Sequence, residues 1–107
     1  MTTATNPRDV PLPAGAEADD DSWAFWDNEF RIFHGADRIV LGAAGEKISE
    51  VRTGGIQLPD GSIDTRECPP SIDVYVLTDD GLTSDQAREL AAALLEAAAE
   101  LDRWTHD

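Results

Sequence analysis

Few residues of this 107-residue chain have the chemistry of catalysis or metal binding, and their spacing brings none of them together. The candidates are two histidines, His34 and His106, and a single cysteine, Cys68. Zinc sites are recognised by closely spaced pairs of Cys and His, and the chain has none. Nothing in the spacing of His34, Cys68 and the carboxylates predicts a catalytic set. We therefore expect no enzymatic activity, no cofactor and no metal.

The 22 acidic residues are the other possible metal ligands. A calcium-binding EF-hand loop needs acidic ligands at alternate positions, glycine at the sixth and glutamate at the twelfth. Stretch 19–29 lacks the glycine, and stretch 60–67 is too short. The chain also has no phosphate-binding loop, dinucleotide fingerprint or G-x-S-x-G nucleophile motif. Solvated carboxylates are therefore the favoured interpretation.

The charge and the cysteine count restrict partners and compartment. The net charge is −14, and only eight scattered Lys and Arg residues are present, which argues against direct binding to nucleic acid or to an anionic membrane. One cysteine cannot form an intramolecular disulfide, so the chain suits a reducing compartment. It has no apolar run long enough for a membrane span and no basic region followed by an apolar one at its start. We expect a cytoplasmic protein.

Aromatic residues concentrate in stretch 22–35, SWAFWDNEFRIFHG. Four of them recur at helical spacing: Trp23, Trp26, Phe30 and Phe33. Asp27-Asn28 could equally turn a hairpin, and we favour a strand at 29–34, leaving 22–28 open between helix and strand. The aromatics either cover the core, which we favour, or anchor a partner, since Trp and Tyr dominate binding hot spots.

The clearest pattern predicts a helix over residues 84–104. Thr83 and Gln86 have the spacing of a capping box, which satisfies free backbone N–H groups at a helix start. The apolar stripe contains Ala87, Leu90, Ala91, Leu94, Ala98 and Leu101. The opposite side carries Arg88, Glu89, Glu96, Glu100 and Arg103. Such a helix is marginal alone and must pack on another element.

Short apolar segments alternating with turn signals precede this helix. They predict strands at about 29–34, 38–43, 47–58, 62–67 and 72–78. Gly54-Gly55 indicates a bulge in the third, because glycine inside a strand usually marks an extra residue. The fold class is α+β, an antiparallel meander of four or five short strands with the C-terminal helix packed on one face.

The first 21 residues have a different composition. They contain three prolines, end in three consecutive aspartates and have few large apolar side chains. Such a segment cannot bury enough surface to offset its ordering entropy. We predict a disordered acidic tail over 1–21 and a single domain over 22–107.

One helix covers only one face of a sheet, so the other face should expose apolar side chains. A contiguous exposed apolar patch tends to mark an interface. Our interface hypothesis therefore includes the aromatic segment and the outward residues of the predicted strands: Trp23, Trp26, Phe30, Phe33, Val40, Tyr75 and Leu77. The partner would be another protein or a second copy of the chain.

The run LTSDQARELAAAL, from Leu82 to Leu94, resembles the C-terminal helix of small uncharacterised actinobacterial and mycobacteriophage proteins. Those proteins pair a glycine-containing hairpin with a helix of the pattern Leu-Thr-x-x-x-Ala-Arg-x-Leu-Ala-x-Ala-Leu. The resemblance covers about the last half of the chain. It implies no activity and no functional residue, and would make this an accessory protein of a phage or mobile-element type.

Three functions compete at this stage. The first is a non-enzymatic interaction module that binds another protein or a second copy of itself to form a homodimer. The aromatic cluster and the uncovered sheet face support it. The second is an acidic DNA mimic that inhibits a nucleic-acid-binding protein, supported by the net charge of −14. The third is a small-molecule enzyme with a site that the spacing does not reveal. We favour the first.

Overall fold

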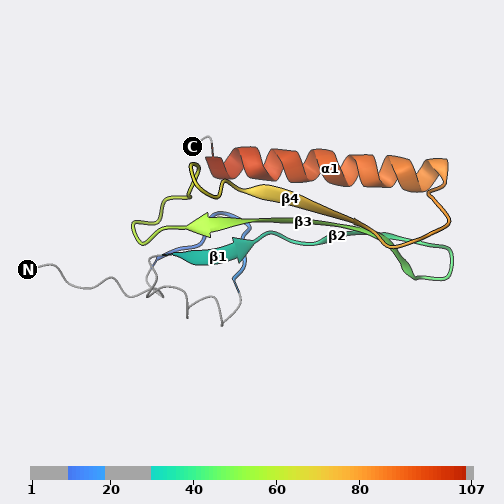
Figure 1. Cartoon of the computed structure of the whole chain (residues 1–107), viewed down its shortest axis with the longest axis horizontal. Helices are drawn as coiled ribbons and strands as arrows, with labels where there is room; N and C mark the ends of the chain where they lie inside the picture. Colours follow the sequence, from blue (N-terminus) through green and yellow to red (C-terminus); the bar gives the residue numbers. More distant parts are fainter. Residues whose placement is uncertain (1–9, 19–29, 106–107) are drawn as a thin grey trace, which may run out of the picture.

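The computed structural model describes residues 10–18 and 30–105. Along the chain it contains strands β1 (Arg31–His34), β2 (Arg38–Leu41), β3 (Lys47–Gln57) and β4 (Ser71–Val76), followed by helix α1 (Ser84–Thr105) (Figure 1). The strands are antiparallel neighbours, and α1 lies along the sheet. The α+β class with a C-terminal helix is thus confirmed.

Strand β3 is the centre of the sheet. β1 and β2 pair end to end with one edge of β3, and β4 pairs with the other edge. His34 lies opposite Gly54 and Arg38 opposite Val51, so the three residues 35–37 face the two residues 52–53. The extra residue is therefore between β1 and β2.

The bulge predicted at Gly54-Gly55 is wrong, because β3 continues through both glycines with constant register to β1. These glycines have another use. A Cβ added to Gly55 would come within 2.8 Å of the Phe33 ring, so the missing side chain gives Phe33 room to pack on the sheet.

The helix begins as the sequence predicts. The Thr83 backbone N–H donates to Gln86 Oε1 at 2.9 Å, and the Gln86 backbone N–H donates to Thr83 Oγ1 at 3.2 Å. These two bonds form the capping box. The helix starts at Ser84 and ends at Thr105, one residue beyond the predicted end.

The face of α1 that meets the sheet differs from the predicted stripe. Its buried residues are Ala93, Ala97, Glu100 and Trp104. The predicted stripe is rotated from this ridge by about a quarter of a turn, at about 100° per residue: Leu90, Leu94 and Leu101 are half-buried, and Ala87, Ala91 and Ala98 are exposed. Glu100, which the pattern placed on the solvent side, is buried.

Specific contacts explain this rotation. The Trp104 ring meets the Phe33 ring edge to face, with centroids 4.9 Å apart, and Thr53 donates to the Glu100 carboxylate. Both partners lie on the sheet face that also carries Val51, whose buried side chain packs with Ala93 and Ala97. Small alanines bring the helix close to the sheet, and hydrogen bonds allow a carboxylate beneath it.

The strand predicted at 62–67 does not form. Ile63 makes an isolated bridge to Gln57, and the chain then turns. The Asp64 carboxylate accepts backbone N–H groups of Arg66, Glu67 and Cys68 at 2.9, 3.2 and 3.2 Å. A side chain that takes three successive donors stabilises a turn instead of a strand. Among residues 10–18 and 30–105, the sheet therefore has four strands.

Residues 10–18 also differ from expectation, since they pack on the domain instead of belonging to a disordered tail. Val10 is buried, and its carbonyl accepts a hydrogen bond from Arg31 at 2.8 Å. The Pro11 carbonyl accepts from Gln57 at 2.8 Å, and Glu17 and His34 exchange two backbone hydrogen bonds. Buried polar side chains thus order a segment that has few apolar ones. The remainder of the predicted tail lies outside the described residues.

Candidate functional site

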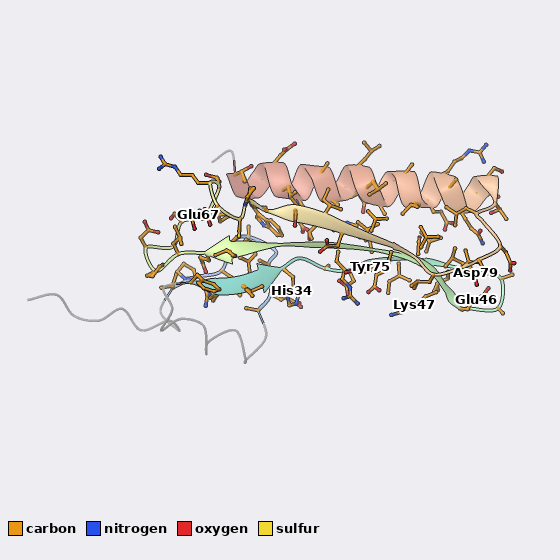
Figure 2. All side chains as sticks on the ribbon, in the orientation of Figure 1. His34, Glu46, Lys47, Glu67, Tyr75 and Asp79 are labelled. Atoms are coloured by element: carbon orange, nitrogen blue, oxygen red, sulfur yellow. The ribbon has the colours of Figure 1, made fainter. Side chains whose placement is uncertain are left out.

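The sheet has one face that α1 does not cover. Side chains alternate along a strand, and residues directly opposite in antiparallel strands share a face. Since Val51, Thr53 and Phe33 face α1, their sequence neighbours face away. Four large apolar residues on that far side keep between 43% and 53% of their surface exposed: Ile32, Ile39, Tyr75 and Leu77. Figure 2 shows Tyr75 and His34 on the side of the sheet away from α1.

Arg52 lies in the middle of this uncovered face. Its Nε donates to Glu50 Oε1 at 3.1 Å and is 3.9 Å from Asp37 Oδ1. The guanidinium also sits over the Tyr75 ring, 5.3 Å from the centroid. Such a cation–π contact fixes the arginine against the sheet. Strands β3 and β4 and the 35–37 bulge therefore present one connected polar and aromatic surface.

The pKa values of this pair follow from the contact. The hydrogen bond from Arg52 lowers the pKa of Glu50 most, with further lowering by the positive charges of Arg52 and Lys47. In return, the hydrogen bond to Glu50 raises the pKa of Arg52. Both groups are charged at neutral pH. The face thus carries a fixed ion pair whose carboxylate is nearly enclosed.

A shallow groove crosses the same face above Gly54. Two adjoining hollows, of about 450 and 280 Å³, share Ile32, Gly54 and Asp73. Gly54 has no side chain and forms the floor. His34 lines one end and Cys68 the other, and no hydrogen bond joins these two described residues. A groove of this depth suits a peptide side chain better than an enclosed small substrate.

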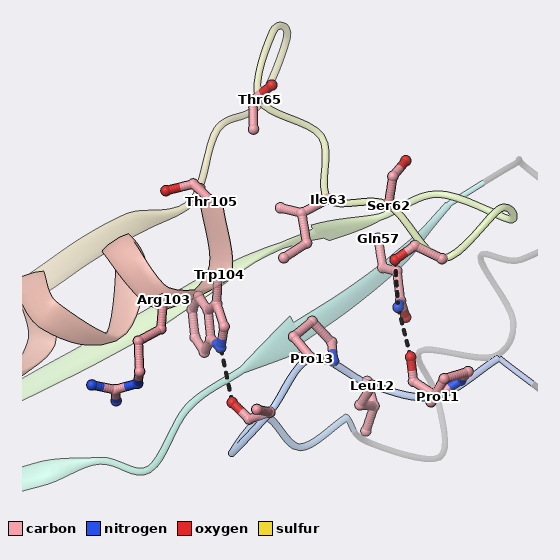
Figure 3. A pocket seen from close by; sticks show the side chains of 12 residues that line it. Pro11, Leu12, Pro13, Gln57, Ser62, Ile63, Thr65, Arg103, Trp104 and Thr105 are labelled. Atoms are coloured by element: carbon pink, nitrogen blue, oxygen red, sulfur yellow. Dashed lines mark hydrogen bonds between the residues drawn. The ribbon is translucent and has the colours of Figure 1, made fainter. Parts of the chain in front are cut away.

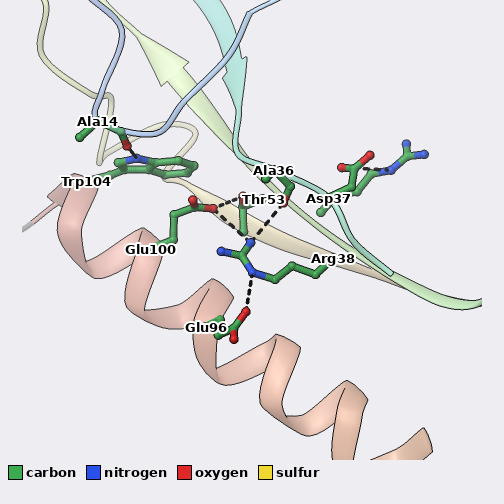
Figure 4. A network of polar contacts seen from close by, with 9 residues as sticks. Ala14, Ala36, Asp37, Arg38, Thr53, Glu96, Glu100 and Trp104 are labelled. Atoms are coloured by element: carbon green, nitrogen blue, oxygen red, sulfur yellow. Dashed lines mark hydrogen bonds and ion pairs between the residues drawn. The ribbon is translucent and has the colours of Figure 1, made fainter. Parts of the chain in front are cut away.

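A second polar cluster lies beneath α1 (Figure 4). The Glu100 carboxylate accepts a hydrogen bond from Thr53 Oγ1 at 2.6 Å and is 3.3 Å from Arg38 Nη1. Arg38 also pairs with Glu96 at 3.4 Å. A Cβ at Gly35 would clash with both Glu100 and Thr53, so only glycine fits beside the carboxylate. This cluster joins α1 to β2 and β3 and has a structural role.

The third feature is a cavity of about 450 Å³ between residues 11–14, the 57–65 loop and the end of α1 (Figure 3). Its walls include Pro11, Leu12 and Ile63. The Trp104 indole N–H donates to the Ala14 carbonyl at 3.1 Å, and Gln57 donates to Pro11. These two donors hold the N-terminal segment against the domain. We therefore assign the residues around this cavity a role in packing.

Next to it, Arg31 is buried and donates through Nε and Nη2 to Gln57 Oε1. Burial lowers the pKa of its guanidinium. The sequence pattern did not single out Arg31 or Gln57. The two residues lie opposite each other in β1 and β3, and this pairing is known only once the register of the two strands is known.

Among residues 10–18 and 30–105, no group of three or more His, Cys, Asp or Glu side chains is placed to hold a metal ion. Within the same ranges, α1 lacks the length of apolar sequence needed to cross a bilayer. Cys68 is exposed and unpaired.

The predicted interface residues are divided between the two faces. Phe33 and Val40 are buried on the α1 side, so their predicted exposure on the open face is wrong; the extra residue at 35–37 and the register to β3 put both beneath the helix. Tyr75 and Leu77 lie on the uncovered face as expected. Phe30 is half-buried. Trp23 and Trp26 lie outside the described residues.

Three residues of the uncovered face were missed: Ile32, Ile39 and Arg52. Ile39 and Tyr75 both lie opposite Glu50, on either side of β3, and Ile32 lies opposite Ile56. Strand parity alone would have assigned them to one face once the register was fixed. Without the register, the extra residue at 35–37 could not be located. It was therefore not possible to tell which side chains of β1 and β2 share a face.

Over the described residues, fold and site together define a two-layer α+β protein with one helix and one open sheet face. The whole chain, residues 1–107, matches the family described as "Domain of unknown function (DUF6907)", and the protein belongs to that family. Comparison with curated proteins gave no match, and comparison with solved structures gave none either.

Proposed function

We propose that this protein is a non-enzymatic interaction module that binds a partner protein on its uncovered sheet face. The observation that carries the proposal is the exposure of Ile32, Ile39, Tyr75 and Leu77 around the fixed Arg52–Glu50 pair. Apolar side chains on ordered strands offer area for contact at little entropic cost. Aromatic and arginine side chains are the residue types enriched in binding hot spots.

The charge of the face indicates the chemistry of the partner. Three acidic side chains, Asp37, Glu50 and Asp73, surround Arg52, and the whole chain carries −14. A segment with apolar residues flanked by Lys or Arg would complement this surface. Nucleic-acid-binding proteins carry such basic segments. Capture of one of them in the test below would support the acidic DNA-mimic hypothesis.

The exposed, unpaired Cys68 supports the proposal that the protein works in a reducing, cytoplasmic setting. The relationship to actinobacterial and mycobacteriophage proteins remains a prediction from the Leu82–Leu94 run. Neither point is needed for the binding face, which rests on β1 to β4 alone.

The test is affinity capture from lysate with the full chain and two variants. Ile32→Lys combined with Ile39→Lys places two cations on the uncovered face, and Leu95→Lys places one on the exposed outer side of α1. We expect the wild type and Leu95→Lys to recover the same partner and the double variant to lose it. Added salt should weaken capture, because the attraction is between opposite charges.

Recovery of the same proteins by all three chains would refute the uncovered face as the binding site. Circular dichroism of each variant provides the folding control, since all three substituted side chains are exposed in the wild type. Isolation of one partner then allows its binding segment to be synthesised and its affinity measured directly.

A further inference from the structure

Strand β4 is an edge strand with unused backbone groups. The Leu77 N–H donates to the Ile48 carbonyl at 2.8 Å, which directs the backbone groups of the odd-numbered residues of β4 toward β3. Backbone groups alternate sides along an antiparallel strand. The N–H and C=O groups of Ile72, Val74 and Val76 therefore point outward, and no strand among the described residues pairs with them.

This edge lacks the features by which monomeric proteins prevent strand pairing. Such proteins use lysines, prolines, bulges or very short strands at their edges. β4 has constant register over all six residues and a single charged side chain, Asp73. The opposite edge is protected: β1 and β2 have four residues each, a bulge separates them, and Glu17 pairs with His34.

The α1 side of β4 is apolar and incompletely covered. α1 lies over β3 and β2, where Glu96 and Glu100 pair with Arg38. Val74 and Val76 face the same side as Val51 but remain 44% and 54% exposed.

The helix continues this surface. Leu90 and Leu94, like Ile72 of β4, pack against the core cluster of Val51, Ala93 and Ala97, and they lie on the flank of α1 opposite Glu96. Further round the same flank are exposed alanines: Ala87, Ala91 and Ala98. No charged side chain lies on this flank between the leucines and the alanines, so it joins the β4 valines in one apolar surface.

We propose that a second copy of this chain pairs with β4, in antiparallel orientation, about a two-fold axis at Val74. The proposal goes beyond the partner binding above and uses a different surface. Val74 lies opposite Val74 of the partner subunit, and Ile72 opposite Val76 of the partner subunit. Every outward backbone group of these residues then meets its complement. Both α1 helices lie on the same face of the joined sheet.

Charge and shape favour a second copy in this register. On the α1 side all cross-strand pairs are apolar. On the other side Asp73 lies opposite Tyr75 of the partner subunit, so no like charges face each other directly. A closed two-fold contact also covers the same edge in both copies and leaves no β4 edge for further growth.

The experiment measures the mass of the full chain in solution by sedimentation velocity over a series of protein and salt concentrations. We expect a dimer that tightens with added salt, because screening weakens the repulsion between two chains of charge −14. Val74→Pro removes an outward N–H without removing a bond to β3, and Val76→Lys puts a cation beside the axis. Each should weaken dimerisation by at least about tenfold.

Ile32→Lys with Ile39→Lys is the matched control, because it alters β1 and β2, which pair with the edge of β3 opposite to β4. This variant should dimerise like the wild type while losing the captured partner, so the two proposals fail independently. A wild type that is a monomer throughout overturns the dimer proposal. A dimer that survives both β4 substitutions also overturns it. A cooperative thermal unfolding transition of Val76→Lys, like that of the wild type, shows that this variant is folded.

Discussion

The Glu100 carboxylate and the Thr53 hydroxyl, 47 residues apart in the chain, share a 2.6 Å hydrogen bond beneath α1. The bond places an acidic side chain in the helix–sheet interface, where burial without a partner would be costly. Arg38 supplies the neutralising charge and also holds the exposed Glu96. One arginine thus contacts two glutamates in very different surroundings.

This pair of glutamates gives the first prediction. Glu100→Ala leaves Thr53 without its acceptor and Arg38 without its enclosed partner, and should lower the free energy of unfolding by about 3 kcal/mol. Glu96→Ala should cost less than about 0.5 kcal/mol, because exposed ion pairs contribute little. The Glu100 side chain is 7% exposed and that of Glu96 69%. Urea unfolding followed by circular dichroism measures both, and equal costs would contradict the structural role of Glu100.

Two buried hydroxyls of β3 give a second prediction. Among the described residues, Ser49 Oγ is buried with no hydrogen-bond partner, whereas Thr53 Oγ1 donates to Glu100. Ser49→Ala should leave the free energy of unfolding unchanged or raise it by about 1 kcal/mol, since it removes an unsatisfied polar atom. Thr53→Ala should lower it by about 1–3 kcal/mol. A large loss for Ser49→Ala in chemical denaturation would contradict the absence of a partner.

The parts of the fold that were predictable depend on local chemistry. Thr83 and Gln86 define the start of α1 through bonds between near neighbours, and the alternation of Ile72, Val74 and Tyr75 assigns β4 its two faces. Both signals are contained in a few consecutive residues. They need no knowledge of what packs against the element.

The errors come from contacts between distant residues. The side of α1 that faces the sheet is decided by Glu100 and Trp104, which bond to Thr53, Arg38 and Ala14, and a hydrophobic stripe contains none of this information. Likewise, the extra residue at 35–37 shifts the parity of β2 against β1. The sequence therefore predicted only part of the exposed face and of the candidate site. Tyr75 and Leu77 were assigned correctly, and Phe33 and Val40 were not.

The N-terminal segment can be tested through Trp104. Trp104→Phe keeps an aromatic ring against Phe33 but removes the N–H that donates to the Ala14 carbonyl. We expect a loss of about 1–2 kcal/mol in the free energy of unfolding. Amide hydrogen exchange should accelerate at Glu17, whose N–H donates to His34 at 2.7 Å.

The internal control for this variant is exchange in the middle of α1, near Ala93, which should stay as slow as in the wild type. Acceleration there to the same degree as at Glu17 would mean that the whole domain loosens. Unchanged exchange at Glu17 would show that the indole N–H does not hold residues 10–18.

The Glu50–Arg52 pair gives a prediction on pH. Because the hydrogen bond from Arg52 holds the folded pKa of Glu50 below its ordinary value of 4.5, the unfolded chain binds more protons there as the solution becomes acidic. The stability contributed by the carboxylate is therefore complete above about pH 4.5 and is lost as the pH falls through the folded pKa. Glu50→Gln lacks this titration.

The measured quantity is the difference in free energy of unfolding between the wild type and Glu50→Gln. Titration of the other carboxylates is common to both chains and largely cancels. We expect the wild type to be more stable at neutral pH and the difference to shrink in acid. In an Arg52→Met background, where the hydrogen bond that lowers the pKa most is gone, the same comparison should depend much less on pH. A difference that stays constant or grows in acid would show that Arg52 does not stabilise the Glu50 carboxylate, and the uncovered face would then lack a fixed ion pair at its centre.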